Sequence, residues 1–581
     1  MNPYQRNAAT FCIYLLTSAA FTWPLVTDPL GLMPTRQFDL YSLLWLVDTA
    51  PELSLSFHSD NAAWPVGQDL SHTDSFLLVV IARLLAFAFS AKAVVAAVTL
   101  LGPVFSAWAA ERFAARCLAA RWPWSLIAGF TFGFSGLTAT AMLEGHGYAM
   151  LDPWLPLLAW SWLRATGEGG DTQHGLTAGF MWAACLLTTA YLGIVATFLV
   201  LAMGLRALFR GTIRPKPMAA AALVALPMGC FYIALFLRSG ALMRLEHGGD
   251  ATVSLAVMHA GSARLGTLAG WVPYVDLGLH SIAPTLGFTA LTLALFASVA
   301  MGKRQKKARS VWRLFVWLGI SSCIISLGPY LDLFAFDLHL PWVLYPLHHF
   351  PAVTSFFHFP VRFLHLTTLC LGALGALVAT RLAETQPKAC APLLLAALAD
   401  ALVGTGAPIR SHAVPLDVPS VYSQAPQDRA ILELFPEFHG MMSDLEFYTS
   451  NLTCFYQTEH HRPLFNRCLG TTIHTDPRWM TNRWLTASLL SDDAKGQIIG
   501  NLQALGVGAV LLHPDLFSPQ DRIEIQLALT KLVGTPVSSD DGGEHLVLYT
   551  IPQSEQNAND SIDLLQSRAT RSYADLVEAW H

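Results

Sequence analysis

YLGIVATFLVLAMGLRAL, residues 191–208, carries one charge in eighteen positions, and runs of this kind decide the fold. A helix needs about 20 mostly apolar residues to cross the hydrocarbon core of a bilayer. The chain of 581 residues is 53% hydrophobic and only 13% charged, whereas soluble domains carry about 25% charged residues. This composition excludes a water-soluble enzyme and predicts an α-helical, polytopic membrane protein.

Similar apolar segments recur up to residue 404 and predict about eleven transmembrane helices. The segment 76–89 is also apolar but has only 14 residues, so it predicts an interfacial or re-entrant helix. No small-residue cleavage site follows the first span, which we therefore expect to be retained. The predicted spans are 8–26, 92–112, 122–142, 151–166, 175–189, 191–208, 217–238, 284–301, 311–327, 361–380 and 388–404.

A shift in charge divides the chain near its last span. Residues 405–581 carry 11 Lys and Arg against 21 Asp and Glu, whereas residues 1–404 carry 24 against 19. In the acidic part, β-like runs at 507–512 and 545–551 flank a helical stretch at 521–532. We therefore predict a multi-span domain over 1–404 and a separate soluble α/β or α+β domain over 405–581.

Lys and Arg gather in alternate loops, and this bias orients the membrane domain. The densest cluster is the run Lys303-Arg304-Gln305-Lys306-Lys307. With a cytoplasmic N-terminus, nearly every basic cluster lies in the cytoplasm, provided that 76–89 does not cross the membrane. The C-terminal domain is then extracytoplasmic, as are the loops 27–91, 239–283 and 328–360.

The first outer loop holds an isolated carboxylate, Asp39, at the start of a short amphipathic helix over 38–45. An acid where the protein meets water can act as a general base, and a carboxylate at this position is equally a good helix N-cap. His72 and Asp74 follow in the same loop and are candidates for binding a sugar, although outer loops often contain such residues.

A second group of polar residues follows the span 122–142 on the same side of the membrane. Glu144 and His146 precede Asp152, which opens the next helix. An acid and an imidazole at this depth could orient an acceptor, bind a divalent ion or tune the base. Equally, Glu144 and His146 are ordinary loop residues and Asp152 is a helix cap. Their spacing matches no known metal site, so the metal stays unknown.

Arg362, in the stretch Phe359-Pro360-Val361-Arg362-Phe363, enters a late span at its outer end. Arginine binds phosphate through a bidentate fork, and a cation at the hydrocarbon edge suits a lipid phosphate. The alternative is an arginine that snorkels to the interface.

The acidic domain contains only two cysteines, Cys454 and Cys468. Outside the cytoplasm they are expected to form a disulfide, although two free thiols are also common. Phosphate loops, serine-nucleophile elbows, Cys-x-x-Cys and His-Glu-x-x-His motifs are absent from the sequence, as is a basic stripe for nucleic acid. These absences argue against an ATP-driven pump and a membrane zinc protease.

The order of these parts resembles the GT-C superfamily of membrane glycosyltransferases, in particular its bacterial members. The resemblance rests on a first helix, the outer loop with Asp39, the His146 loop before Trp154-Leu155-Pro156-Leu157, the stretch 359–363 and the outer-domain run 505–513. It implies a bacterial inner-membrane enzyme that moves a sugar from a polyprenyl-phosphate donor to a glycan, lipid or protein acceptor.

Carried onto this chain, the resemblance makes Asp39 the base and lets Arg362 hold the departing lipid phosphate. Glu144 or His146 then stands where many relatives have a second acid. The chain departs from the usual pattern because Phe38 precedes Asp39, so no adjacent acidic pair exists. Dependence on a divalent metal is therefore open, and no other cofactor is implied.

The rival hypothesis is a non-catalytic transporter or assembly protein for lipid-linked glycans or a surface polymer. A transporter should carry charged residues at mid-membrane depth. Asp400 and Arg83 are the candidates, and neither lies in a clearly broken helix. A simple anchor for the outer domain hardly needs eleven spans.

Overall fold

The fold is taken from a computed structural model, which describes most of the chain. Contacts divide the chain into two compact units. The first comprises Met1–Arg36, Thr73–Arg238 and His247–Val414, and the second comprises Gln37–His72, Ser239–Glu246 and Pro415–His581. The described residues are 2–34, 38–52, 58–59, 68–69, 76–143, 145–146, 151–167, 170–246, 258–259, 262–263, 268, 275–276, 281–282, 286–287, 289, 291–294, 306–333, 336–349, 359–404, 414–435, 444–465, 485–486, 489, 495–541 and 544–553.

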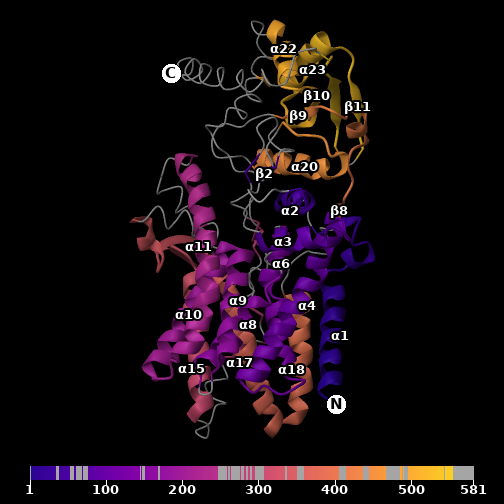
Figure 1. Ribbon diagram of the computed structural model, residues 1–581. Helices are drawn as coiled ribbons and strands as arrows, with labels where there is room; N and C mark the ends of the chain where they lie inside the picture. The colour runs from indigo at the N-terminus through magenta and orange to yellow at the C-terminus, as the bar shows by residue number, and fades with distance from the viewer. Residues whose placement is uncertain are drawn as a thin grey trace. The chain divides into compact units, whose positions relative to one another are not determined.

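The first unit is a bundle of helices (Figure 1). Four stretches among its described residues are long and apolar enough to cross a membrane, namely Ala91–Cys117, Ala190–Phe209, Pro215–Ala234 and Pro360–Thr385. The chain is therefore a helical membrane protein, while the count of about eleven spans stays a prediction. The larger helices of the unit are α1 (Pro3–Phe21), α3 (Phe76–Leu85), α4 (Ala91–Cys117), α5 (Leu126–Gly133), α6 (Gly136–Leu143), α8 (Trp154–Ala165), α9 (Thr172–Thr188), α10 (Ala190–Phe209), α11 (Pro215–Glu246), α15 (Lys306–Ser326), α17 (Leu364–Thr385) and α18 (Pro387–Ala399).

Helices occupy each predicted span except 284–301, most of which lies outside the described residues. The expectation of one continuous helix over 122–142 was wrong. α5 ends at Gly133, and the chain restarts as α6 after Ser135, whose hydroxyl accepts a hydrogen bond from the Thr138 N–H (3.3 Å). A serine that caps the next turn offers the backbone an alternative to continuing the helix, which explains the break.

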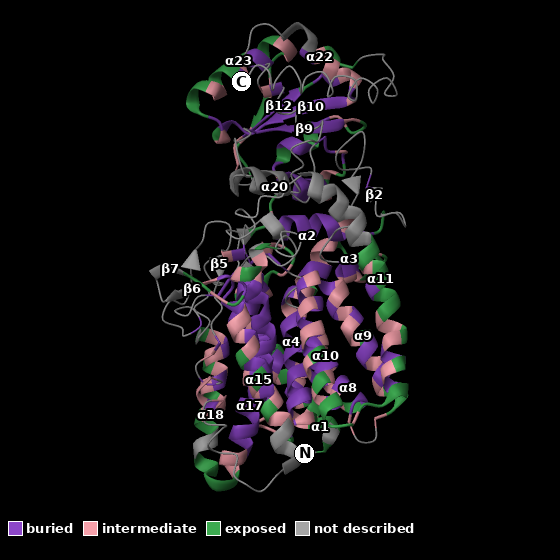
Figure 2. Ribbon diagram, turned by 90° about the vertical axis from the view of Figure 1, so that its left-hand side faces the viewer, coloured by how far each residue is buried: buried purple, intermediate pink, exposed green. Residues whose placement is uncertain are grey.

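The core of this unit surrounds α17, which is buried along most of its length and packs against α5 and α15. Gly372 permits the close approach of α17 to α5, because a Cβ there would lie 3.0 Å from the Ala128 carbonyl oxygen. α11, in contrast, exposes large apolar side chains such as Leu223 (72%) and Leu226 (64%) (Figure 2). Exposed leucines on a helix this apolar suit contact with lipid.

The second unit contains a four-stranded sheet in the order β11-β12-β10-β9. β9 (Ala430–Leu434) and β10 (Val507–Leu512) run parallel, and β12 (Leu546–Thr550) pairs antiparallel with β10 and with β11 (Val537–Ser539). The apolar runs at 507–512 and 545–551 are thus both strands. α22 (Lys495–Ala504) and α23 (Pro519–Val533) contribute to the apolar core beside the sheet.

α2 (Phe38–Thr49) belongs to this second unit and not to the membrane bundle. It packs on α20 (Asp444–His460), where the Trp45 indole N–H donates to Gln457 Oε1 (2.6 Å) and the Tyr41 ring stacks on Phe455. Leucine, tryptophan and valine side chains on every side of α2 are buried. The predicted amphipathic helix along the interface is therefore a buried helix of the second unit. The predicted domains 1–404 and 405–581 stay a prediction.

The described residues of the first unit also include several short elements. η3 (Pro360–Phe363) is a 3-10 turn that leads directly into α17, and a π-helical turn (Asp400–Gly404) ends α18. Two-stranded pairs occur at β4 (Val275–Asp276) with β5 (Ser281–Ile282) and at β6 (Tyr330–Leu333) with β7 (Phe336–Pro341). In the second unit, β2 (His58–Ser59) pairs with β3 (Gln68–Asp69).

Candidate functional site

Two segments of the first unit that are far apart in sequence meet in a buried polar cluster. Arg362 on η3 places its Nη2 atom 2.8 Å from Nδ1 of His146, which follows α6. Both residues are only 6% exposed. Two of the predicted site residues are therefore in direct contact, although 216 positions separate them.

The contact fixes where the proton of His146 lies. A guanidinium has N–H donors and no acceptor, so the Nδ1 atom of His146 must accept the hydrogen bond. An imidazole that accepts at Nδ1 is neutral and carries its proton on Nε2. In this arrangement the Nδ1 lone pair of His146 is occupied by Arg362.

A second link joins the same two segments. His365, in the first turn of α17, places its Nδ1 atom 3.1 Å from Oδ2 of Asp152, and both side chains are at least 90% buried. The other carboxylate oxygen of Asp152 accepts a long hydrogen bond from the Leu155 N–H (3.4 Å). Asp152 thus acts as a helix cap through one oxygen and faces a histidine with the other.

Aromatic packing holds the arginine segment in place. Pro360 begins η3, and the Phe363 ring packs edge-on against Phe198 of α10. Phe359 makes the same kind of contact with Tyr191, with ring centroids 5.5 Å apart. Tyr191 is 6% exposed and supports the chain just before Arg362.

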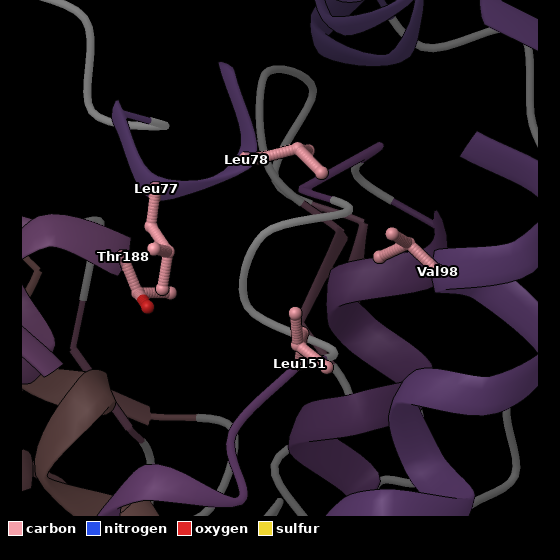
Figure 3. Close-up of a pocket in the computed structure, with 5 residues that line it drawn as sticks. All are labelled: Leu77, Leu78, Val98, Leu151 and Thr188. Atoms are coloured by element: carbon pink, nitrogen blue, oxygen red, sulfur yellow. The ribbon is translucent and has the colours of Figure 1, made fainter. Parts of the chain in front are cut away.

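A small apolar cavity of about 10 Å³, room for about one water molecule, is lined by residues from α3, α4 and α9 and from the segment before α8 (Figure 3). Leu151, the neighbour of Asp152, contributes to its wall, and Thr188 supplies its one hydroxyl group. The other lining residues are Leu77, Leu78 and Val98.

Several predicted site residues lie outside the described part of the chain. This holds for Glu144, His72, Asp74 and Cys468, while of Asp39 only the backbone, in the first turn of α2, is described. Cys454 is buried and disulfide-bonded. The convergence of the predicted acids on Arg362 and the pairing of the two cysteines stay predictions. Within the described residues, no group of three or more His, Cys, Asp or Glu side chains is arranged to hold a metal.

Reasoning from sequence missed His365. Its signal was the spacing of three positions from Arg362 at the start of a predicted helix, which places both side chains on one face. The partner in the contact, Asp152, was noted only as a possible helix cap.

The second unit contains a buried network of its own at the carboxyl ends of the parallel strands. Glu433 on β9 lies 2.9 Å from Nε2 of His513, which follows β10, and accepts a hydrogen bond from the Tyr422 hydroxyl (2.9 Å). Burial alone would lower the pKa of His513, but the hydrogen bond and charge of Glu433, together with the charge of Glu544, raise it. The two carboxylates therefore favour the protonated form of His513 at this edge of the sheet.

Comparison with solved structures identifies the fold. The chain is similar to the arabinofuranosyltransferase AftD from Mycobacteria, with a TM-score of 0.52 and 15% identity over 95% of this chain and 40% of that chain. A second structure, the AftD mutant R1389S in its class 1 form, gives 0.54 at 14% identity over 94% of this chain and 41% of that chain. At this identity the likeness defines the fold, and the chain spans about two fifths of AftD.

A looser likeness links the chain to the oligosaccharyltransferase AglB from Archaeoglobus fulgidus, with a TM-score of 0.45, 11% identity, and coverage of 95% of this chain and 75% of that chain. No family model matches the sequence, and no curated protein matches it either. The resemblance to the GT-C superfamily of membrane glycosyltransferases is therefore confirmed as a likeness of fold.

Proposed function

We propose that this protein is a GT-C-type membrane glycosyltransferase that moves a sugar from a polyprenyl-phosphate donor to a glycan, lipid or protein acceptor outside the cytoplasm. The observation that carries the proposal is the contact of buried Arg362 with His146 at the start of α17. The fold shared with AftD supports the same class of reaction.

The Arg362–His146 cluster suits the phosphate group of such a donor. A guanidinium presents a planar fork of N–H groups that matches phosphate oxygens, and the neutral His146 adds an Nε2–H donor. The cluster is also buried in a unit whose long helices are apolar enough to cross a membrane. A phosphate carried on a lipid is therefore proposed as the donor in preference to a free nucleotide sugar.

The reaction then proceeds as a substitution at the anomeric carbon. The acceptor hydroxyl attacks this carbon, and its proton passes to the Asp39 carboxylate. The bond between the anomeric carbon and the phosphate oxygen breaks, and its electron pair stays on the phosphate. Arg362 and the His146 N–H stabilise the negative charge that develops there.

The position of Asp39 supports its role as base. Its backbone lies in the first turn of α2, where the helix dipole favours a negatively charged carboxylate. Glu144, His72 and Asp74 complete the proposed site as residues that orient the acceptor or bind the sugar. A divalent metal is an optional addition to this proposal, and its mechanism uses no step that requires one.

The proposed topology has a cytoplasmic N-terminus, about eleven spans over 1–404 and an extracytoplasmic domain over 405–581, in a bacterial inner membrane. The basic loops support this orientation, because Lys and Arg remain preferentially in the cytoplasm. A disulfide between Cys454 and Cys468 fits an oxidising compartment.

The test measures the rate of sugar transfer when the purified protein, reconstituted in membranes, is supplied with lipid-linked sugars isolated from cells. Arg362→Ala should reduce transfer by about 10²-fold or more, the effect of removing one donor from a developing anion. The matched control is Arg381→Ala, near the other end of α17, where the arginine pairs with Glu384 (3.1 Å) and is partly exposed. Equal rates for the two variants would contradict the proposed role of Arg362.

A further inference from the structure

Basic side chains gather where α10 leads into α11, far from the proposed donor site. The basic turn, as this cluster is called below, consists of Arg206, Arg210, Arg214 and Lys216. α10 begins beside the arginine segment, where Tyr191 packs on Phe359. Its 20 residues then carry the chain about 30 Å away. The basic turn therefore lies at the other end of the first unit from Arg362.

The helices that meet at the basic turn carry no acid near it. The sequence has no Asp or Glu between residues 172 and 245, a range that covers α9, α10 and nearly all of α11. The acid just before this range, Asp171, caps α9 and pairs with His174 (2.7 Å). Within the described part of the chain, Arg210, Arg214 and Lys216 form no ion pair. The described surroundings thus leave three cations of the basic turn without an acidic partner.

Other cations at this end of the unit are compensated. α17 begins beside α10, and both helices run away from the donor site. Arg381 near the end of α17 and Arg121 before α5 both pair with Glu384 (3.1 and 3.3 Å). The preference of basic residues for the cytoplasmic side explains both groups of cations, but it does not require that the basic turn lack acids.

The backbone of the basic turn has a defined shape. Gly211 has a φ of +64°, and the Thr212 N–H donates to the Ala207 carbonyl oxygen (3.0 Å), as in a Schellman motif. The start of α11 is fixed against α9, because a Cβ on Gly175 would lie 2.2 Å from the Pro217 carbonyl oxygen. The cations are therefore carried by an ordered backbone, which lowers the entropy cost of binding a ligand.

Large apolar side chains are exposed directly beside the cations. Residues 208–211 and 213–216 are all exposed (Figure 2). Phe209 is 86% exposed and Leu208 is 59% exposed, next to Arg210. Exposed aromatic and leucine side chains between cations are typical of a surface that meets lipid headgroups and the upper part of the acyl chains. Such a surface matches a ligand with an anionic head and an acyl chain, and a free phosphate lacks the second part.

We propose that the basic turn binds the phosphate group of an anionic phospholipid in the cytoplasmic leaflet. The guanidinium groups of Arg210 and Arg214 donate to phosphate oxygens, and Lys216 adds a point charge. The acyl chains lie against Leu208 and Phe209. The choice of leaflet rests on the proposed orientation, whereas the binding chemistry depends neither on this orientation nor on sugar transfer.

The test uses native mass spectrometry of the purified full chain in a neutral detergent. Dioleoylphosphatidylglycerol is the anionic probe, and dioleoylphosphatidylcholine, which has no net charge, is the neutral one. Wild type should bind phosphatidylglycerol more tightly than phosphatidylcholine, and added salt should reduce the difference. The combined variant Arg210→Gln, Arg214→Gln and Lys216→Gln should bind phosphatidylglycerol about 10²-fold more weakly, because each cation contributes about fivefold.

A matched control removes cations from the same end of the unit. The combined variant Arg121→Gln and Arg381→Gln loses two charges that already pair with Glu384, so its affinity for phosphatidylglycerol should equal that of wild type. A second variant tests the apolar part of the surface. Phe209→Ser keeps every cation and should weaken binding of phosphatidylglycerol about tenfold.

A soluble competitor distinguishes a lipid from a free phosphate. Glycerol 3-phosphate in excess should leave phosphatidylglycerol bound, because it lacks the acyl chains. Full displacement by glycerol 3-phosphate, with unchanged binding in Phe209→Ser, would assign the basic turn to a soluble phosphate and overturn the lipid proposal. Equal affinity of wild type for the two lipids, or unchanged affinity for phosphatidylglycerol in the variant without the three cations, would also overturn it.

Discussion

Arg362 Nη2 and His146 Nδ1 lie 2.8 Å apart in the interior of the membrane unit. The contact decides the chemistry of both residues, because arginine can only donate and the histidine must accept. Of the roles predicted for His146, the contact therefore favours hydrogen bonding in the neutral form, next to a permanent cation. A guanidinium suits an anionic ligand, and this is the basis of the proposed function.

The first prediction concerns the role of His146. His146→Gln offers an acceptor for Arg362 and an N–H donor for the ligand, so transfer should stay within about tenfold of wild type. His146→Leu removes both and should lower transfer by about 10²-fold. The measurement is the initial rate of sugar transfer by membranes with equal amounts of each variant. Equal inactivity of the glutamine and leucine variants would contradict the hydrogen-bonding role of His146.

The second prediction concerns Asp39. Asp39→Asn keeps the shape of the side chain but removes the proton acceptor, so transfer should fall by about 10²-fold or more. The control is Asp48→Asn in the last turn of the same helix, which tests for general damage to α2. Wild-type rates in the Asp39→Asn protein would exclude this residue as the base.

The sequence predicted much of the fold because its elements are long and apolar. Segments such as 191–208 and 361–380 coincide with α10 and α17, and the run 507–512 is a strand. The break between α5 and α6 was missed because hydropathy continues across Ser135, whose local hydrogen bond ends the helical pattern. The sequence did not predict that α2 belongs to the second unit, because its partners on α20 are about 400 positions away.

The site was predicted only in part, because its contacts join residues that are far apart in the sequence. Arg362 and His146 were selected by residue type and by their expected depth, yet their contact arises in the folded chain, where η3 packs against α15 and α10. His365 was missed because a histidine in an apolar segment usually indicates a core residue. Asp400, a candidate for a transporter, instead accepts a hydrogen bond from the Thr289 N–H (2.6 Å), a structural role.

The third prediction is topological. Tags inserted at 302–310 should be accessible only from the cytoplasm, and tags after residue 405 only from outside, because the run Lys303-Arg304-Gln305-Lys306-Lys307 resists translocation. Labelling of each tag in intact and in permeabilised cells checks both sides. A tag after residue 405 found in the cytoplasm would contradict an odd number of spans.

The fourth prediction is that the stability of the second unit depends on pH. Glu433 and Glu544 raise the pKa of His513 in the folded state above the unfolded value, which is about 6.5. The stabilisation is therefore complete below about pH 6.5 and is lost as the pH rises through the folded pKa. Hydrogen-exchange protection of β9 and β10 in the full protein, corrected for intrinsic rates, should decline over this range. His513→Gln should remove the decline, and a decline that persists in this variant would assign it to another group.

The most direct test of the central claim is mass spectrometry of lipid-linked sugars in cells that express wild type, Arg362→Ala, Arg381→Ala or no protein. A membrane glycosyltransferase that uses a lipid-linked donor consumes it, so one polyprenyl-phosphate sugar should accumulate severalfold without the protein and with Arg362→Ala. Wild type and Arg381→Ala should both restore the low level. An unchanged pool of polyprenyl-phosphate sugars in all four strains would contradict the account.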